Sequence, residues 1–436
     1  MAKNRTDWMM NDRFGMFIHW GIYSIPAQGE WYRSDKEVAD EEYRKYMYGF
    51  DPTRFDAREW ARLAKRAGMR YAVLTAKHHD GFCLFDSKYT DFKITNTPYG
   101  KDIVREFLEA FRSEGIKVGL YYSLLDWDHP DFPHYGDENH PMRNNLQYKD
   151  YKYNFDNYIT YMHNQVEELC TGYGKLDMIW FDFSYPGMEG EKWGATKLVR
   201  MVKKYQPDAL MDTRLGTGGD SFGTLVTEHP TEYAGDFASC EQILPPEQIR
   251  NYKGDPVPWE ACITLNNHWG YHRYDHEYKT PKTIIKSLVD CVSKGGNLLL
   301  NVSPNAYGEI PREAANILEE VGDWMAVNGE SIYGCGASDL PRPECGRMTQ
   351  NGNIYYVHIL DEFIGPITVK GLDKKSVKSA ALLESGAEVT MLNRWVTLNF
   401  PEYQYMSFAP DEFGTVSIPD NRDTVIKIVM RDKDLI

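Results

Sequence analysis

The sequence has no long apolar run and no surplus of basic residues. No stretch of about 18 apolar residues is present, and the polar start, Met1 to Asp12, lacks the apolar segment of a signal peptide. Its 49 Lys and Arg against 64 Asp and Glu give a net charge of −15, which argues against a nucleic-acid partner or an acidic lipid surface. We therefore expect a soluble, cytoplasmic protein with no membrane and no nucleic-acid partner.

Cysteines are few and widely scattered. There are seven of them, an odd number, and none shows CxxC spacing. This pattern argues against a disulfide framework and against a zinc cluster. Aromatic residues are abundant instead, at 14% of the chain. Because aromatic rings fill cores and also stack on the C–H faces of sugars, this abundance alone does not choose between the two roles.

Short apolar segments alternate with amphipathic ones through most of the chain, which is typical of parallel β/α architecture. The expected strands are 71–75, 117–123, 177–182, 209–214, 261–265 and 297–302, with weaker candidates at 14–19 and 223–227. Eight strands with helices between them fit a (β/α)8-like barrel. The active site of such a barrel lies at the carboxyl ends of its strands.

Helix signals separate these strands. Asp56, with Glu59 three residues later, resembles a capping box, and Asp102 is placed to cap the next helix. Pro311 is expected in the first turn of a third helix. These signals support the alternation of strands and helices.

The pattern changes after Tyr333. Residues 334–346 are rich in Gly, Pro and Cys, and short strands without a convincing helix follow, at 354–359, 381–383 and 424–430. We predict a catalytic (β/α)8-like barrel over residues 1–335, followed by a small C-terminal β-sandwich domain over residues 345–436.

Asp182 ends the expected strand 177–182, which is apolar except at its ends. A carboxylate at the end of a barrel strand emerges into the active-site mouth, where it suits a nucleophile. The same residue also fits a turn that caps the next loop. Trp180 points to the same side as Asp182 on an extended strand, and it either floors a sugar pocket or fills the barrel.

Other polar and aromatic residues stand at further strand ends. His78 and His79 can donate hydrogen bonds to substrate hydroxyls or bind a metal, although metal-binding barrels commonly use two His at i and i+2. One buried and one exposed His is a third interpretation. The remaining candidates are His19, Glu30, Trp31, Arg214 and Trp269. Their common placement is stronger evidence for a site than any single member.

A second carboxyl group is needed if Asp182 attacks a glycosidic carbon, because the leaving oxygen must be protonated and a water activated. The expected sixth strand, 223–227, is followed by a long loop with Glu228, Glu232 and Glu241, of which Glu241 has the more apolar neighbours. Glu241 also fits a cap of a following helix. The residues alone leave its role open.

These segments together resemble the α-L-fucosidases of glycoside hydrolase family 29. The resemblance runs from about Phe14 to Tyr333 and continues more faintly beyond. It is carried, in the right order, by Phe17 to Ser24, Glu30 to Tyr32, Lys77 to Phe82, Trp180 to Asp182, Trp259-Glu260, Asn267 to Tyr271, Gly296 to Val302 and Asn328 to Tyr333.

The resemblance implies a retaining exo-α-L-fucosidase that acts on fucosylated oligosaccharides or glycosides and needs no metal or other cofactor. It implies Asp182 as the nucleophile. The implied substrate-binding residues are His19, His78 and His79 for fucose hydroxyls, and Trp31, Trp180, Arg214 and Trp269 for the pocket walls, with Glu30 and Tyr121 as further members.

The segment from Gly235 to Pro245 resembles the acid/base segment of the broad-specificity subgroup, with Ser239-Cys240 where Thr-Pro is more frequent. It selects Glu241 as acid/base ahead of Glu228. Two alternatives stay open. A non-catalytic fucose-binding protein would need neither carboxylate, and a metal-dependent barrel hydrolase would need ligands beyond the two adjacent histidines. The sequence also leaves open whether the chain forms a homo-oligomer.

Overall fold

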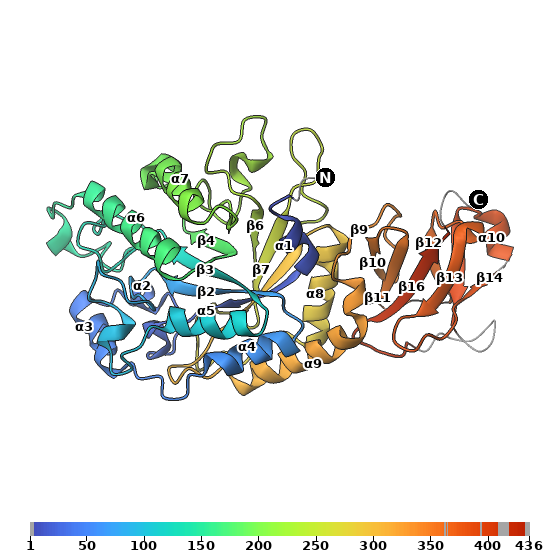
Figure 1. Cartoon of the computed structure of the whole chain (residues 1–436), viewed down its shortest axis with the longest axis horizontal. Helices are drawn as coiled ribbons and strands as arrows, with labels where there is room; N and C mark the ends of the chain where they lie inside the picture. The colour runs from blue at the N-terminus through green and yellow to red at the C-terminus, as the bar shows by residue number, and fades with distance from the viewer. Residues whose placement is uncertain (1–3, 362, 364, 393–394, 409–417, 432–436) are drawn as a thin grey trace.

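The computed structural model describes residues 4–361, 363, 365–392, 395–408 and 418–431 (Figure 1). Both outer limits of the predicted domains, residues 1 and 436, lie outside the described residues. Within these ranges a parallel barrel comes first and two antiparallel sheets follow it along the chain. No helix in the described ranges is long and apolar enough to span a membrane.

Eight parallel strands form one sheet in the order β5-β4-β3-β2-β1-β8-β7-β6. They are β1 (Phe14–Ile18), β2 (Tyr71–Lys77), β3 (Lys117–Ser123), β4 (Met178–Asp182), β5 (Leu210–Met211), β6 (Ala238–Glu241), β7 (Trp259–Thr264) and β8 (Asn297–Val302). An isolated parallel bridge between Asp212 and Phe237 joins the two edges beside β5 and β6. The sheet therefore closes into the (β/α)8-like barrel that the sequence predicts.

Six longer helices surround the strands: α4 (Ala57–Arg66), α5 (Ile103–Ser113), α6 (Phe155–Gly172), α7 (Ala195–Tyr205), α8 (Pro281–Ser293) and α9 (Arg312–Asn328). Figure 1 shows α5, α4 and α9 side by side below the barrel. The Asp56 side chain accepts hydrogen bonds from amides in the first turn of α4, and Asp102 does so for α5, as predicted. Pro311 stands at the N-cap of α9, one position before the first turn.

Three shorter helices, α1 (Asp7–Asp12), α2 (Tyr32–Asp35) and α3 (Asp40–Arg44), lie before β2 in the chain. Helix α2 begins directly after Trp31, so it carries one of the predicted pocket residues at its start. Helix α1 precedes β1, and Lys117 at the start of β3 forms an ion pair with Asp12 of α1. Helix α1 therefore lies at the amino ends of the strands, and α2 lies at their carboxyl ends.

The alternation of strands and helices breaks between β5 and β7. The described chain there contains the short 3-10 turn Gly223–Val226 and no α-helix. The expected strand 223–227 is therefore wrong, because residues 223–226 are only half-buried and Thr227 begins an exposed stretch. Strand β6 instead buries small side chains against β7, with Ala238 opposite Trp259. Glu241 is consequently the last residue of a barrel strand and does not lie in a long loop.

Two antiparallel sheets form the C-terminal part. The five-stranded sheet has the order β13-β16-β11-β10-β9, and the three-stranded sheet has the order β12-β15-β14. Their bounds are β9 (Gly336–Ala337), β10 (Gly346–Asn351), β11 (Ile354–Ile359), β12 (Ile367–Lys370), β13 (Val377–Leu382), β14 (Thr390–Leu392), β15 (Tyr403–Ser407) and β16 (Thr424–Met430). Val357, Val369 and Met406 share one buried core between the sheets, as in the predicted β-sandwich.

Two details of this part differ from the sequence analysis. A short helix, α10 (Trp395–Asn399), lies between β14 and β15 although no helix is expected there. Strand β9 pairs with β10 ahead of residue 345, the predicted start of the second domain. The C-terminal part contacts the barrel at two places: Arg347 of β10 forms an ion pair with Asp290 of α8, and Trp324 of α9 donates to the carbonyl of Asp423 at 3.1 Å.

Candidate active site

One cavity of about 230 Å³ opens at the carboxyl ends of the barrel strands. Asp182 ends β4 and Glu241 ends β6, while the other predicted residues follow β1, β2, β5 and β7 or lie on β3 and β4. Parallel strands bring such residues to one end of a barrel. The predicted residues that line this cavity are His19, Trp31, His78, His79, Tyr121, Trp180, Asp182, Arg214, Glu241 and Trp269.

Hydrogen bonds orient both carboxylate oxygens of Asp182. The Tyr121 hydroxyl donates to Oδ2 at 2.7 Å, and Arg214 Nη1 donates to Oδ1 at 3.2 Å. Burial raises the pKa of Asp182 to about 6, against the lowering effect of Arg214, and the nearby Glu241 carboxylate raises it further. With 14% of its side chain exposed, Asp182 is an oriented carboxylate that still faces the cavity.

Arg214 also binds the second carboxylate. Its Nη2 donates to Glu241 Oε2 at 3.0 Å, so one guanidinium contacts both acids. Gly219 covers this pair closely, because a Cβ there would lie 2.8 Å from both Arg214 Nη1 and Glu241 Oε2. A side chain at this position would therefore push the guanidinium or the Glu241 carboxylate away from its present place.

Each of the two carboxylates is followed by a residue in the left-handed backbone region. Phe183, after Asp182, has φ +82°, and Gln242, after Glu241, has φ +58°. Non-glycine residues in this region store about 1–3 kcal/mol of strain and persist only where neighbours hold them. The side chain of Gln242 is held in this way, because its Nε2 donates to Thr264 Oγ1 at 3.0 Å. The chain thus turns sharply directly after each acid.

Three buried histidines form the opposite wall and are neutral. Burial lowers the pKa of His19 to about 3 and the pKa values of His78 and His79 well below their usual range. His19 Nδ1 donates to Asn301 Oδ1 at 2.7 Å, which leaves Nε2 as an acceptor. His78 Nδ1 is buried and has no hydrogen-bond partner among the described residues.

His79 is fixed by the end of β3. Its Nδ1 lies 2.7 Å from Ser123 Oγ, and the Ser123 hydroxyl donates to the Leu125 carbonyl at 3.0 Å. Because that hydroxyl has only one proton, His79 Nδ1 is the donor and Nε2 is left as an acceptor. The Trp127 amide donates to the His79 carbonyl at 2.9 Å. The tautomer and the position of His79 therefore both depend on this loop.

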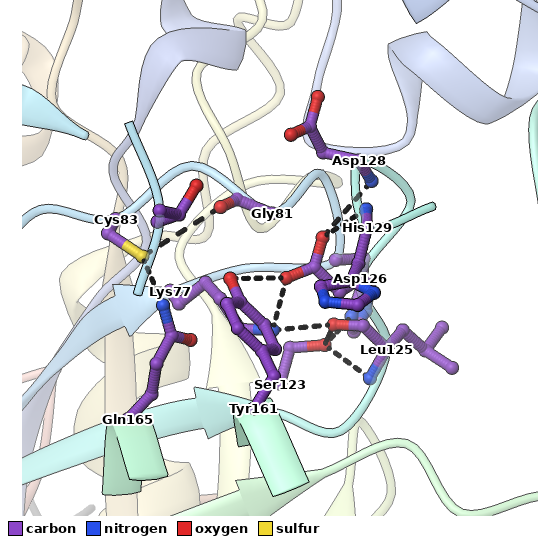
Figure 2. Close-up of polar contacts among 12 residues, drawn as sticks. Lys77, Gly81, Cys83, Ser123, Leu125, Asp126, Asp128, His129, Tyr161 and Gln165 are labelled. Atoms are coloured by element: carbon purple, nitrogen blue, oxygen red, sulfur yellow. Dashed lines mark hydrogen bonds and ion pairs between the residues drawn. The ribbon is translucent and has the colours of Figure 1, made fainter. Parts of the chain in front are cut away.

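A buried ion pair holds the same loop, as Figure 2 shows. Lys77 Nζ donates to the Leu125 carbonyl and to Asp126 Oδ2, both at 3.0 Å, and the two side chains are 0% and 1% exposed. Further donors to the Asp126 carboxylate are the amides of Asp128 and His129 and the hydroxyl of Tyr161. The ends of β2 and β3 are thereby joined beneath His79.

Gly81 completes this packing. It has φ +85°, and a Cβ there would lie 2.2 Å from Asp126 Oδ1. Only glycine allows the chain after His79 to pass so close to the carboxylate.

Trp180 forms the cavity floor and is held from below. Its Nε1 donates to Glu260 Oε1 at 3.3 Å, and the Tyr71 hydroxyl donates to Glu260 Oε2 at 2.5 Å. Burial raises the pKa of Glu260 to about 7. Above the floor, the Trp180 ring stacks on Tyr121 with centroids 5.7 Å apart. The floor is therefore a fixed aromatic surface next to Asp182.

The structure does not place Glu30 on the cavity wall. Glu30 is buried, and its Oε2 accepts a hydrogen bond from the Gly270 amide at 2.7 Å. Burial raises its pKa. Because Gly270 follows Trp269, Glu30 supports the loop that carries this ring. Its role as a direct sugar ligand stays a prediction.

The competing glutamates lie elsewhere. Glu228 is exposed, and Glu232 forms an exposed ion pair with Arg200 of α7 at 2.8 Å. Neither lines the cavity. The structure therefore brings Glu241, and not these two residues, next to Asp182.

Several lining residues were not predicted. Phe17 of β1 and Cys262 of β7 are two of them, and the others come from the loops after β3, β4 and β5 and include Glu138, Asn139, Phe183, Tyr185, Gly218 and Gly219. The position of Phe183 directly after Asp182 was the one signal available in the sequence. Across the described residues, no group of three or more His, Cys, Asp or Glu side chains is arranged to hold a metal ion.

Comparisons with known proteins agree on one family. A family profile described as Alpha-L-fucosidase matches residues 1–330. The plasma α-L-fucosidase of Homo sapiens is 30% identical over 356 residues, which cover 76% of this chain and 70% of the human protein. An α-L-fucosidase of Dictyostelium discoideum is 28% identical over 442 residues, which cover 92% and 90% of the two chains.

Solved structures are similar over nearly the whole chain. α-L-Fucosidase isoenzyme 1 from Paenibacillus thiaminolyticus is 55% identical with a TM-score of 0.93, covering 98% of this chain and 99% of its own. A Bacteroides thetaiotaomicron α-L-fucosidase, solved as a trapped covalent intermediate with 2-fluoro-fucosyl fluoride, is 28% identical with a TM-score of 0.81. That match covers 99% of this chain and 97% of the Bacteroides chain.

Proposed function

Because this chain belongs to the α-L-fucosidases of glycoside hydrolase family 29, we propose that it releases terminal α-L-fucose from oligosaccharides or glycosides with retention of configuration. The observation that carries the proposed mechanism is the Arg214 guanidinium, which contacts Asp182 and Glu241 in one cavity. Asp182 is the nucleophile and Glu241 the acid/base.

The reaction proceeds by two displacements. The Asp182 carboxylate attacks the anomeric carbon, the bond to the leaving oxygen breaks, and the Glu241 proton passes to that oxygen. Glu241 then takes a proton from water, the water oxygen attacks the anomeric carbon, and the ester to Asp182 breaks. Each displacement inverts the configuration, so the product keeps that of the substrate.

The shared guanidinium favours this route over direct inversion. Retaining enzymes hold their carboxyl groups about 5–5.5 Å apart, whereas inverting enzymes leave about 6.5–9.5 Å for a water. One cation in contact with both acids favours the closer spacing. The covalent intermediate trapped in the Bacteroides relative supports the same route.

Neutral histidines and aromatic rings suit the fucose ring. His19 and His79 each present an Nε2 acceptor, and sugar hydroxyls can donate to both. Fucose carries a methyl in place of a hydroxymethyl, and apolar faces such as those of Trp269 and Trp31 can accommodate it. His78 adds a further polar contact from the same wall.

Proton NMR of the first-formed sugar anomer tests the proposal. We expect α-L-fucose to appear first from 4-nitrophenyl α-L-fucoside, with the β anomer growing only through mutarotation. First appearance of the β anomer would reject the double displacement. The absence of any turnover would favour a fucose-binding protein instead.

A mass-spectrometric experiment tests the nucleophile. A 2-fluoro-fucosyl fluoride should label the chain. Fluorine at C2 slows both the formation and the breakdown of the ester, and the good fluoride leaving group speeds up only its formation, so the ester accumulates. Peptide mapping should place the label on Asp182. A label on another carboxylate would contradict this assignment.

A further inference from the structure

The cavity has a buried inner part and a more exposed outer part. Inner side chains such as His79 and Trp180 are 2% exposed, whereas the Glu241 side chain is 38% exposed. We define the outer rim as five half-buried or exposed lining residues from the loops after β3, β4 and β5: Glu138, Asn139, Tyr185, Gly218 and Gly219. Phe183 is not counted, because its ring packs on His79 in the inner part. A leaving group beside Glu241 must pass this outer rim.

Hydrogen bonds hold the outer rim in place. The Tyr185 hydroxyl donates to Asp137 Oδ2 at 2.5 Å, which joins the loop after β4 to the loop after β3. Ser34 Oγ donates to the Asn139 carbonyl at 2.7 Å, and Arg143 Nη1 donates to the Ser34 carbonyl at 3.1 Å. Because these loops are tied to each other and to α2, the side chains between them keep defined positions.

Carboxylates outnumber cations around the cavity. Glu138 joins Asp182 and Glu241 as a lining acid, and the Asp220 carboxylate lies 3.2 Å from where a Cβ of Gly218 would stand. Among the described lining residues, Arg214 is the only Lys or Arg, and Asp182 and Glu241 already engage it. An anionic leaving group would meet repulsion here without a free positive partner.

Asn139 adds a polar group beside Glu138. Its Nδ2 is buried without a hydrogen-bond acceptor in the described part of the chain. The residue as a whole is only half-buried and lines the cavity, so a hydroxyl-rich leaving group contacts the exposed part of Asn139 and not Nδ2. The Glu138 carboxylate, in turn, can accept from hydroxyl or amide donors.

We propose that the outer rim is a leaving-group subsite that accepts neutral, hydroxyl-rich aglycones and rejects anionic ones, with Glu138 as the selecting charge. The inference rests on the proposed function, because it places the leaving oxygen beside Glu241. Glu138 acts on the charge of the leaving group and takes no part in the chemistry at the anomeric carbon.

Two aryl fucosides that differ in one charge test this selection: 3-carboxy-4-nitrophenyl α-L-fucoside and its 3-carboxamide counterpart. At low salt we expect kcat/KM to favour the carboxamide by about fivefold, the effect of one partly screened like charge at close range. The preference should shrink at about 0.5 M salt, because screening weakens it.

Variants assign the preference to Glu138. Glu138→Gln should reduce the ratio of the two kcat/KM values by at least about twofold, and Glu138→Lys should bring the carboxylate substrate level with or ahead of the carboxamide. Glu189→Gln is the matched control, because Glu189 is an exposed acid on the neighbouring loop that does not line the cavity. This control should leave the ratio unchanged.

The outcomes separate the inference from the proposed function. If both Glu138 variants leave the ratio at its wild-type value while fucosides are still hydrolysed, the inference is overturned and the proposed function stands. If the wild-type chain hydrolyses no fucoside, the proposed function fails and the inference fails with it.

Asn139→Ala tests the polar side of the subsite. We expect kcat/KM for a neutral fucosylated disaccharide to fall about fivefold more than kcat/KM for 4-nitrophenyl α-L-fucoside, because only the sugar leaving group offers hydroxyls to the half-buried Asn139 side chain. An equal loss on both substrates would contradict contact with the leaving group. A thermal melt of the variant, matched to wild type, shows that the fold is intact.

Discussion

Two buried clusters of opposite charges lie at strand ends of this barrel, and they are satisfied in different ways. In the first, Arg214 is shared between Asp182 and Glu241, and the two carboxylate side chains keep 14% and 38% of their surface exposed. In the second, Lys77 and Asp126 are 0% and 1% exposed, and donors from the neighbouring loop and α6 surround the carboxylate (Figure 2).

The difference separates a site from its support. A charge cluster that serves a ligand keeps part of its surface open, and the ligand or its leaving group completes it. A cluster that uses its contacts internally fixes the chain around it. Here the second cluster holds Leu125, and through Ser123 it also sets the tautomer of His79. The two clusters should therefore respond oppositely to mutation.

Asp182→Asn should have the largest effect on turnover. A neutral amide cannot form the ester intermediate, so kcat for an aryl fucoside should fall by about 10⁴-fold or more. The free energy of unfolding should not fall comparably, because burial already disfavours the ionised carboxylate. Steady-state kinetics and urea unfolding measure both. Near-normal turnover in the pure variant would show that Asp182 is not the nucleophile.

Glu241→Gln should lower kcat/KM by about 10²- to 10⁴-fold for fucosides with sugar leaving groups and by less for 4-nitrophenyl α-L-fucoside. The reason is that a good leaving group needs little protonation. Glu228→Gln is the matched control, an exposed glutamate outside the cavity. A larger loss in Glu228→Gln than in Glu241→Gln would show that Glu241 is not the acid/base.

Lys77→Met should act first on stability, and any loss of turnover should arise through the displaced His79. It leaves the Asp126 carboxylate buried without its cation, which costs about 3–5 kcal/mol in the free energy of unfolding. Lys45→Met breaks an exposed pair with Glu42 and should cost little. Urea unfolding measures both variants. Equal losses in the two variants would mean that the buried Lys77–Asp126 pair stabilises the fold no more than an exposed pair does.

The pH dependence of kcat/KM should show the smallest effect. The nucleophile must be ionised, so kcat/KM should fall as the pH drops below about 6, the raised pKa of buried Asp182. Glu241→Gln removes a negative neighbour that raises this pKa. The acidic limb should therefore move to lower pH in that variant, measured with 4-nitrophenyl α-L-fucoside. A shift to higher pH would mean that Glu241 does not act on Asp182 in this way.

The sequence predicted one half of the barrel better than the other. Strands β2, β3, β4 and β8 have at least five residues each, most of them apolar, and the Asp56 and Asp102 caps mark the helices that precede β2 and β3. Strand β6 has only four residues, with small side chains, and it becomes a strand by pairing with β7. The more apolar stretch before Glu228 was therefore mistaken for it.

The candidate site was predicted to a similar extent. Strand-end placement and the family resemblance named most of the side chains that line the cavity, including both carboxylates. The outer rim was missed because Glu138 and Asn139 lie in a loop without periodicity. Their positions depend on contacts with distant Ser34 and Tyr185. The cytoplasmic location and the domain limits at residues 335 and 345 stay predictions.

The stretch from β5 to β7 bears on how this barrel can tolerate changes in chain length. No α-helix covers the described chain there, so added residues would lengthen loops without displacing a packed helix. Doubling the length of a flexible loop costs only about 0.6 kcal/mol. Insertions after Gly219 and before Phe237, which spare Arg214 and the Asp212–Phe237 bridge, would thus reshape the surroundings of the proposed acid/base Glu241 while Asp182 stays on its helix-supported strand.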